Sequence, residues 1–379
     1  MGLKNGRGLF SIGLDLIVKD QALPYDIYVN ASSSNDSLNF VKIVQSGTVL
    51  AEADIAKLGE KYFQIYIMEA QRENYLETLV MSKHLTTQKK AEVVKDIAID
   101  HLQNLFNSRD TLSNEILTDA LINCRDTVRH LVDLIEDKSI TEIQELIGML
   151  SFHDFYTYDH SINVCMYCIA IYRAQHTSAS KDELIQVGMA GLLHDLGKMK
   201  IPTDIINKPA KLTDEEFSII KTHPALGIQI LNDNSPNVPN VDMALVRKVI
   251  LQHHENWDGR GYPNNLSGDT IHPVARMCAI ADFFDAITTK RSYGEVLSTA
   301  DAVALMAQSA GKKLDPTLFE NFTKNVKKLV MRTYGRELDE HFDPSQPHDK
   351  LPFKEKKATI LQSDIFGQQN KKKAASGAN

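Results

Sequence analysis

Short apolar runs separated by polar turns make up the first part of the chain. Residues 26–30 and 39–43 are rich in β-branched and aromatic residues, and 63–67 is a third run of this kind. A segment with helical character, 52–61, lies between the second run and the third. Such runs, bounded by turn residues, predict strands. Residues 1–73 are therefore expected to form a small α+β module, with a regulatory role and a ligand that the sequence does not identify.

A helical pattern replaces these runs after residue 73. Apolar residues between 94 and 105 fall on one helical face, and those between 117 and 135 alternate in spacings of four and three. That alternation is the seam of a short coiled coil or of a helix pair in a bundle. Residues 74–139 are expected to form a helical connector. The seam is too short to decide between a helix pair within the chain, a relay and a dimer contact.

Helical segments interrupted by prolines continue from residue 140 to residue 343. The last stretch, 344–379, is polar and rich in lysine, and its apolar content is too low for packing, so a disordered tail is expected. The predicted fold class is mainly α. A C-terminal all-α helical bundle follows a small α+β N-terminal module and connecting helices.

Composition narrows the class of protein without changing this fold. Of the 379 residues, 43% are hydrophobic and 24% are charged, which is ordinary globular usage and excludes a fully disordered or collagen-like chain. A formal net charge of −7 argues against a nucleic-acid backbone or an anionic membrane as the main partner. No apolar run approaches the ~18 residues of a membrane span, and the first ten residues lack the apolar core of a signal peptide.

The four cysteines are too few for a disulfide framework and fit a reducing cytoplasm, which is the expected localisation. Cys165 and Cys168 stand three residues apart in an apolar helical run, and no second cysteine pair completes a zinc site. We expect them to be small core residues rather than a zinc or redox motif.

Histidines and aspartates gather in the second half of the chain. His194 and Asp195 are adjacent at the end of a predicted helix, and two consecutive histidines precede a glycine-rich turn. Neutral imidazoles are common ligands of first-row transition metals, and a structural histidine is normally solitary. The whole set is His160, His194, Asp195, His223, His253, His254 and Asp282. Singly, each is more simply a hydrogen-bonded core or surface group; together they match the ligand count of a two-metal site with room for water and substrate.

Residues 140–342 resemble the HD-GYP domain, a subgroup of the HD metal-dependent phosphohydrolases. The resemblance rests on long motifs that follow one another in order. They are His194-Asp-Leu-Gly-Lys198, Ile206-Asn-Lys-Pro-Ala-Lys-Leu-Thr213, Lys221-Thr-His-Pro224, His253-His-Glu-Asn-Trp-Asp-Gly-Arg-Gly-Tyr-Pro263 and Asp282-Phe-Phe-Asp-Ala-Ile-Thr288. The resemblance implies an HD-type helical bundle and phosphodiesterase activity on cyclic di-GMP, a bacterial second messenger. It does not extend to the N-terminal module.

The resemblance also implies a role for each matching residue. The metal ligands fall on the seven residues above, with Asp195 bridging two divalent ions, iron or manganese. Asp195 and Lys198 are the implied catalytic residues. The implied substrate contacts, or the groups directly behind them, are Lys198, Tyr262, Asp285 and Arg291. Two metals activate a water and neutralise phosphoryl oxygens, and Lys198 and Arg291 add positive charge where the transition state gathers negative charge.

Three functions are compared on this basis. The first is hydrolysis of cyclic di-GMP to linear pGpG, with hydrolysis onward to GMP undecided. The second is a catalytically weak module that binds the nucleotide and signals to a partner, and the third is a phosphohydrolase acting on another nucleotide. The full ligand set favours the first over the second, and the Gly-Tyr-Pro loop favours it over the third. The expected partner is cyclic di-GMP, without nucleic acid or membrane; a signalling protein at the Gly-Tyr-Pro loop and a homodimer stay open.

Two positions depart from the family pattern. Tyr156 stands four residues before the first histidine ligand, where some members carry a glutamate that allows a third metal, so two metals are expected here. Gly294 stands where the family usually has a second cation after Arg291. Losing one charge-assisted contact costs about 1.5–3 kcal/mol, so weaker binding of cyclic di-GMP is expected unless Lys290, Arg260 or a partner supplies the charge. A shift toward another nucleotide is the remaining alternative.

Overall fold

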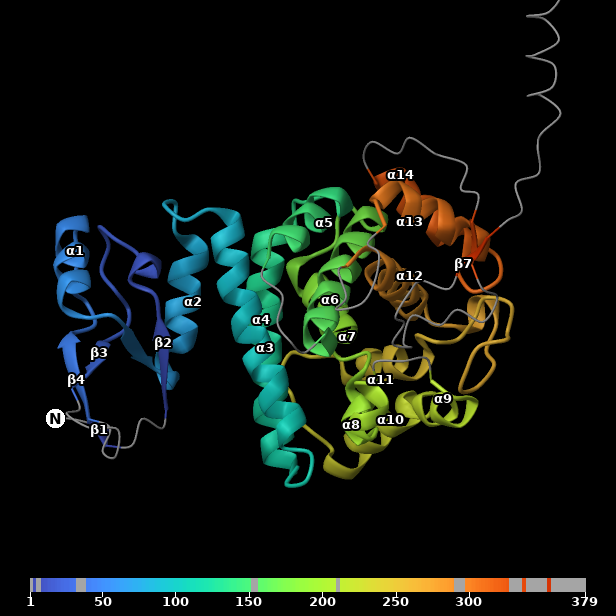
Figure 1. Ribbon diagram of the computed structural model, residues 1–379, viewed down its shortest axis with the longest axis horizontal. Helices are drawn as coiled ribbons and strands as arrows, with labels where there is room; N and C mark the ends of the chain where they lie inside the picture. The colour runs from blue at the N-terminus through green and yellow to red at the C-terminus, as the bar shows by residue number, and fades with distance from the viewer. Residues whose placement is uncertain are drawn as a thin grey trace, which may run out of the picture.

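The computed structural model describes residues 3–4, 8–31, 39–150, 156–208, 212–289, 297–326, 336–338 and 353–355. A small sheet stands at one end of the molecule and a larger helical bundle at the other, with three helices between them (Figure 1). The predicted mainly α fold class is therefore confirmed.

The N-terminal sheet is antiparallel in the pairings of its five strands, which lie in the order β1-β4-β3-β5-β2. Its strands are β1 (Leu3–Lys4), β2 (Leu9–Ile12), β3 (Ile27–Asn30), β4 (Asn39–Val44) and β5 (Ile65–Met68). Helix α1 (Glu52–Lys61) precedes β5, and 3-10 turns stand at Leu14–Leu16 and Glu69–Gln71. The three strands expected from sequence appear as β3, β4 and β5, while β1 and β2 are additional.

The connector consists of α2 (Arg72–Met81), α3 (Thr87–Asn107) and α4 (Asn114–Ile135). Thr86 and Ser113 cap α3 and α4 through their hydroxyls, which accept hydrogen bonds from backbone amides of the first turn. The apolar seam of α4 is 0–1% exposed within this chain, where α4 packs against α3, α6 (Tyr156–Gln175) and α7 (Lys181–Leu192). The seam therefore belongs to an intramolecular helix packing and offers no face to a second copy.

The C-terminal bundle is built around α6, which packs against α7 and α12 (Pro273–Thr288). Its other helices are α5 (Ile140–Met149), α8 (Thr203–Ile206), α9 (Asp214–Ile220), α10 (His223–Asn234), α11 (Met243–Gln252), α13 (Thr299–Met306) and α14 (Pro316–Asn325). The 3-10 helix η3 (Leu196–Lys200) follows α7, and shorter 3-10 turns stand at Gly268–Thr270 and Ala307–Ser309. Cys165 and Cys168 are buried, unbonded thiols, as expected of core residues.

Two short strands lie beyond the helices, β6 (Arg336–Leu338) and β7 (Phe353–Glu355), and pair antiparallel. The second lies within 344–379, so this part of the expected disordered tail has strand structure. The remainder of that tail lies outside the described residues.

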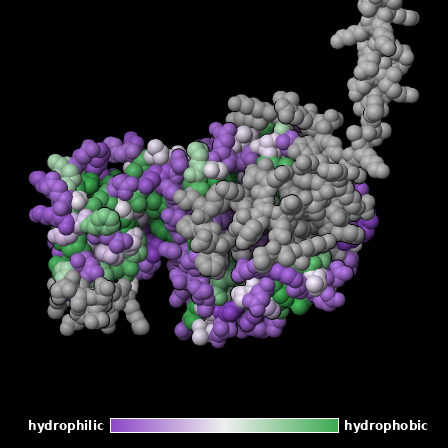
Figure 2. All heavy atoms as spheres, in the orientation of Figure 1, coloured by the Kyte–Doolittle hydropathy of each residue, from purple (hydrophilic) through white to green (hydrophobic). Residues whose placement is uncertain are grey.

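Surface character differs along the molecule. In Figure 2, hydrophobic residues are mixed with hydrophilic ones over the N-terminal module, and the visible lower part of the bundle is mainly hydrophilic. Val49 and Phe63 of the module are large exposed hydrophobic residues. Within the described residues, no helix is both long enough and apolar enough to cross a bilayer.

Two buried histidines predict that the connector is sensitive to acid. The ring of His101 lies 3.1 Å from the Thr127 hydroxyl, and that of His130 lies 3.0 Å from the Glu73 carboxylate. Burial lowers the pKa of each histidine to about 4. In the unfolded chain both have an ordinary pKa near ~6.5, so the unfolded state takes up protons first as the pH falls.

The free energy of unfolding should therefore be highest above about pH 6.5 and should decline toward about pH 4, by on the order of 3 kcal/mol for each histidine. Urea unfolding across this range measures the loss. A variant with His101→Gln and His130→Gln should show a flatter pH profile than the wild type. Identical slopes for the two proteins would show that these histidines do not cause the acid sensitivity.

Candidate metal centre

The seven predicted ligand side chains come together in the interior of the bundle. Most stand at helix ends, and two stand within long helices. His160 lies in α6 and Asp282 in α12; His194 and Asp195 follow α7, His223 begins α10, and His253 and His254 follow α11. All seven are 0–8% exposed.

A close backbone approach at Gly197 brings two of these elements together. A Cβ atom at this position would lie 1.8 Å from the carbonyl oxygen of His223 and 2.5 Å from the amide nitrogen of Gly227. Only glycine lets η3 lie this close to α10. Asp195, at the start of η3, is thereby held beside His223.

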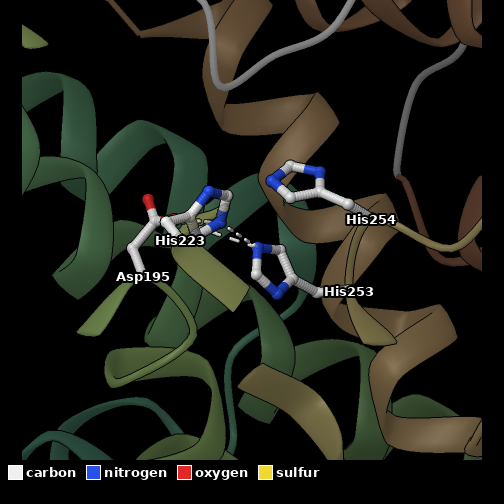
Figure 3. A group of neighbouring side chains, drawn as sticks. All are labelled: Asp195, His223, His253 and His254. Atoms are coloured by element: carbon white, nitrogen blue, oxygen red, sulfur yellow. Dashed lines mark hydrogen bonds and ion pairs between the residues drawn. The ribbon is translucent and has the colours of Figure 1, made fainter. Parts of the chain in front are cut away.

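The seven side chains divide into two groups. Ligand atoms of Asp195, His223, His253 and His254 lie within 4.8 Å of one another, and so do those of His160, His194 and Asp282. Figure 3 shows the first group, with Asp195 and two histidine rings turned toward one another and His254 alongside. Groups of three and four histidines and carboxylates are the donor sets of first-row transition metals.

The Asp195 carboxylate lies between the two groups. Its Oδ1 atom is 3.2 Å from Nε2 of His223 and 3.8 Å from Nε2 of His253, in the first group. Its Oδ2 atom is 3.2 Å from Nε2 of His194, in the second. One oxygen therefore faces each group, which is the arrangement required of a bridging ligand.

The histidine rings are oriented by hydrogen bonds at Nδ1. Nδ1 of His194 lies 2.7 Å from the Gly191 carbonyl oxygen, and Nδ1 of His223 lies 2.8 Å from that of Ile220. The Nδ1 atom of His253 faces the carbonyl oxygens of Val249 and Ile250 at 3.1 and 3.0 Å. A carbonyl oxygen only accepts, so Nδ1 carries the proton in each ring. The Nε2 lone pairs are thereby left for a metal.

Several buried atoms of these side chains have no hydrogen-bond partner among the described residues. Nε2 of His194, Oδ1 of Asp195 and Nε2 of His254 are buried without a hydrogen bond. Buried polar atoms are normally paired, so such orphans point to a missing ligand. A metal in each group would satisfy them, and the residues present therefore fit divalent ions.

The protonation states of His253 and Asp195 agree with metal binding. Burial lowers the pKa of His253 to about 3, with the neighbouring His194 and His223 adding to the effect. Burial alone would raise the pKa of Asp195, but His194 and Lys198 outweigh it and hold that pKa well below the usual range. A neutral imidazole and an ionised carboxylate are the forms that bind a metal.

Asp285 lies behind His160 and is fully buried. Its Oδ2 atom is 2.7 Å from Nδ1 of His160, and its Oδ1 atom accepts hydrogen bonds from Asn163 Nδ2 at 2.9 Å and Thr289 Oγ1 at 2.5 Å. The described contacts of Asp285 orient the ring of His160, and its expected role at the substrate stays a prediction.

Replacing Asp285 with asparagine should weaken metal binding by about 10–100-fold, because loss of the carboxylate behind a histidine ligand misorients the ring. Equilibrium dialysis of the variant against Mn²⁺ measures the affinity. Thr289→Val, which removes one hydrogen bond to the same carboxylate, should cost much less. Equal affinities for wild type and Asp285→Asn would contradict this role.

Lys198 contacts the carboxylate between the two groups, and Tyr262 lies at the first group. Nζ of Lys198 is 2.5 Å from Oδ2 of Asp195, and the side chain is 8% exposed. The Tyr262 ring stacks on the His254 ring, with centroids 4.8 Å apart and an angle of 25° between the planes. Arg291 and Gly294 lie outside the described residues, so the expected effect of the missing second cation stays a prediction. The side chain of Tyr156 also lies outside the described part of the chain.

Glu255 shapes the loop that carries Tyr262. Its carboxylate is buried and accepts hydrogen bonds from the backbone amides of Asn264 at 2.7 Å and Leu266 at 2.9 Å. Trp257, in the same loop, lies under the guanidinium of Arg276 at 5.3 Å. The tryptophan therefore packs the loop.

Sequence reasoning missed Asn163, Glu255 and Thr289. Each acts through a neighbour and lies outside the set that suggested metal ligation. The only signal for Glu255 was its place directly after the two histidines. For Asn163 and Thr289 the signal was their spacing of three from His160 and four from Asp285, which places them on the same helical faces.

An adjacent His-Asp pair that joins two metal-ligand groups inside a helical bundle defines the class of HD-type proteins. Residues 131–318 match the family model described as HD domain. This segment, just under half of the chain, has the sequence pattern of the HD domain family, and the expected recognition is confirmed. The match begins within α4, before the expected start at residue 140.

Several curated relatives of the chain are named for cyclic dinucleotides. A cyclic di-GMP phosphodiesterase of Pseudomonas aeruginosa is 37% identical over 62% of this chain and 56% of its own length. A cyclic di-GMP phosphodiesterase of Thermotoga maritima is 35% identical over 52% of each chain. A 3'3'-cGAMP-specific phosphodiesterase of Vibrio cholerae is 35% identical over 42% of this chain and 30% of its own length.

The chain thus spans about half the length of the first two relatives. Among solved structures, an HDG"Y"P protein from Bdellovibrio bacteriovorus aligns with a TM-score of 0.52 and 18% identity. The alignment covers 84% of this chain and 99% of that one. It supports the fold.

Proposed function

We propose that the chain is a metal-dependent phosphodiesterase that hydrolyses cyclic di-GMP to linear pGpG. The observation that carries the proposal is the placement of Asp195, with one carboxylate oxygen facing each of two ligand groups. Curated relatives named for cyclic di-GMP hydrolysis support the choice of substrate.

The seven ligand residues would hold two divalent ions, iron or manganese, since their donor set is imidazole and carboxylate without thiolate. When bound, such ions polarise phosphoryl oxygens and lower the pKa of a water that attacks phosphorus. The residues themselves fix where this happens. Asp195 sets the spacing of the two groups, and hydrogen bonds at Nδ1 keep the rings aimed inward.

Lys198 and Tyr262 would meet the substrate. The Lys198 ammonium, beside the bridging carboxylate, places positive charge where negative charge gathers in the transition state. Tyr262, stacked on His254 in a loop held by Glu255, offers an aromatic face and a hydroxyl for contact with the nucleotide. Arg291 remains a proposed contact to the phosphates.

Turnover assays on the metal-loaded full chain test the proposal. Cyclic di-GMP and 3'3'-cGAMP are supplied in parallel, and linear products are separated by chromatography. We expect pGpG from cyclic di-GMP as the faster reaction. Binding of cyclic di-GMP without product would instead identify a sensor. Faster cleavage of 3'3'-cGAMP would identify that dinucleotide as the preferred substrate.

We propose a cytoplasmic site of action, since the four thiols are free and buried and the substrate is an intracellular messenger. The N-terminal module is proposed to regulate the bundle through the connector helices. A signalling protein at the Gly-Tyr-Pro loop and a homodimer would each appear as a larger species in light scattering.

A further inference from the structure

A buried ion pair joins the connector to the metal centre. Nζ of Lys95, in α3, lies 2.5 Å from Oδ1 of Asp159, in α6, and the two side chains are 1% and 2% exposed. Lysine is almost never this buried without a partner. Removing two charges from water is costly, and a pair of apolar residues would fill the same space at lower cost.

Asp159 directly precedes His160 in α6. Neighbouring residues on a helix point about 100° apart, so this turn of α6 is held from two directions. On one side Asp159 meets Lys95 of α3, and on the other His160 meets Asp282 and Asp285 of α12. Tyr158 adds a second contact to α3 through an edge-on ring contact with Phe106, with centroids 5.3 Å apart.

Helix α3 lies outside the segment that matches the HD domain model, which covers residues 131–318. The position of His160 therefore depends on contacts from α12 within the domain and on contacts from α3 of the connector. The side chain of His160 reaches Asp282 in its own ligand group at 3.1 Å, so a small shift of this turn changes the geometry of that group.

We propose that Lys95 is a positioning residue of the metal centre: through Asp159 it fixes the turn of α6 that carries His160. The inference rests on the proposed function, since it concerns the same metal centre. It adds a residue outside the family domain on which metal affinity depends. The group of His160, His194 and Asp282 depends on Lys95, whereas the group built on Asp195, His223, His253 and His254 does not.

The test removes the pair without leaving a lone buried charge. The double variant Lys95→Met with Asp159→Leu replaces both side chains with apolar ones of similar size, which commonly leaves stability unchanged or higher. The matched control is Thr127→Val, which removes the buried hydrogen bond between His101 of α3 and Thr127 of α4 and leaves the Lys95–Asp159 pair in place.

Metal-free full-length proteins are titrated with Mn²⁺ in equilibrium dialysis, with elemental analysis of bound metal and melting temperatures of the same samples. We expect two ions per chain in the wild type and in Thr127→Val. In the double variant one ion should bind as in the wild type and the other at least about tenfold more weakly, at an unchanged or higher melting temperature. Two ions of wild-type affinity in the folded double variant would overturn the proposal.

If the double variant does not fold, Asp159→Asn serves in its place, because it keeps shape and a polar contact to Lys95 but removes the charge. The same selective weakening of one ion is expected, and wild-type binding of both ions overturns the proposal. The readout is metal affinity, so the inference stands or falls separately from the substrate. Wild-type chain that binds two ions but leaves cyclic di-GMP intact would refute the proposed function alone.

Discussion

Replacing Asp195 with alanine should abolish hydrolysis and release metal. This carboxylate faces both ligand groups, so its loss removes a ligand from each ion and the negative charge that lies between two cations. Turnover should fall by about a thousandfold or more. Bound metal should drop below two ions per chain in elemental analysis of the purified variant.

Two further variants sharpen this test. Asp195→Asn keeps the shape of the side chain and should lose most of the activity, because the amide cannot supply a second anionic oxygen. Asp204→Ala removes an exposed aspartate and should behave as the wild type. Wild-type turnover at full metal content in Asp195→Ala would show that the carboxylate is not a bridging ligand.

Replacing Lys198 with alanine should lower kcat by about 10²–10³ while leaving both metals in place. The ammonium lies 2.5 Å from the Asp195 carboxylate but is not itself a metal ligand. Removing it leaves that carboxylate more negative, which does not weaken metal binding. Lys198→Ala is therefore expected to differ from Asp195→Ala in its metal content: it should keep both metals although its turnover is slow.

Lys198→Arg keeps the charge and should recover part of the rate. Lys200→Ala, which removes an exposed lysine in the same 3-10 helix, is the matched control and should leave kcat unchanged. Metal loss in Lys198→Ala, as large as in the aspartate variant, would mean that the lysine supports the metals rather than the transition state.

Four of the seven proposed metal ligands stand out in the sequence because they occur as two adjacent pairs, whereas His160, His223 and Asp282 are solitary and depend on the resemblance for their assignment. Two consecutive histidines and a His-Asp pair are visible without any tertiary information. Asp285 was found by resemblance, but its burial behind His160 depends on how α6 and α12 pack, so its position could not be derived. The expected effect of Arg291 and Gly294 on the affinity for the substrate stays a prediction.

Contacts between distant segments were beyond sequence reasoning. Lys95 and Asp159 look like ordinary surface charges in their own helices, and only the packing of α3 on α6 turns them into a buried pair. Strand β2 was missed for another reason. Its four residues, Leu9–Ile12, lie between glycines, and the segment is too short to show an alternation of apolar and polar residues.

The Glu255 carboxylate has a consequence for the conformational entropy of binding. It holds the backbone at Asn264 and Leu266, and so orders the loop with Tyr262 before any nucleotide arrives. Ordering a flexible loop costs about 1–2 kcal/mol for each residue. In this chain that cost is met during folding, so the affinity of the aromatic face for a ligand is not reduced by it.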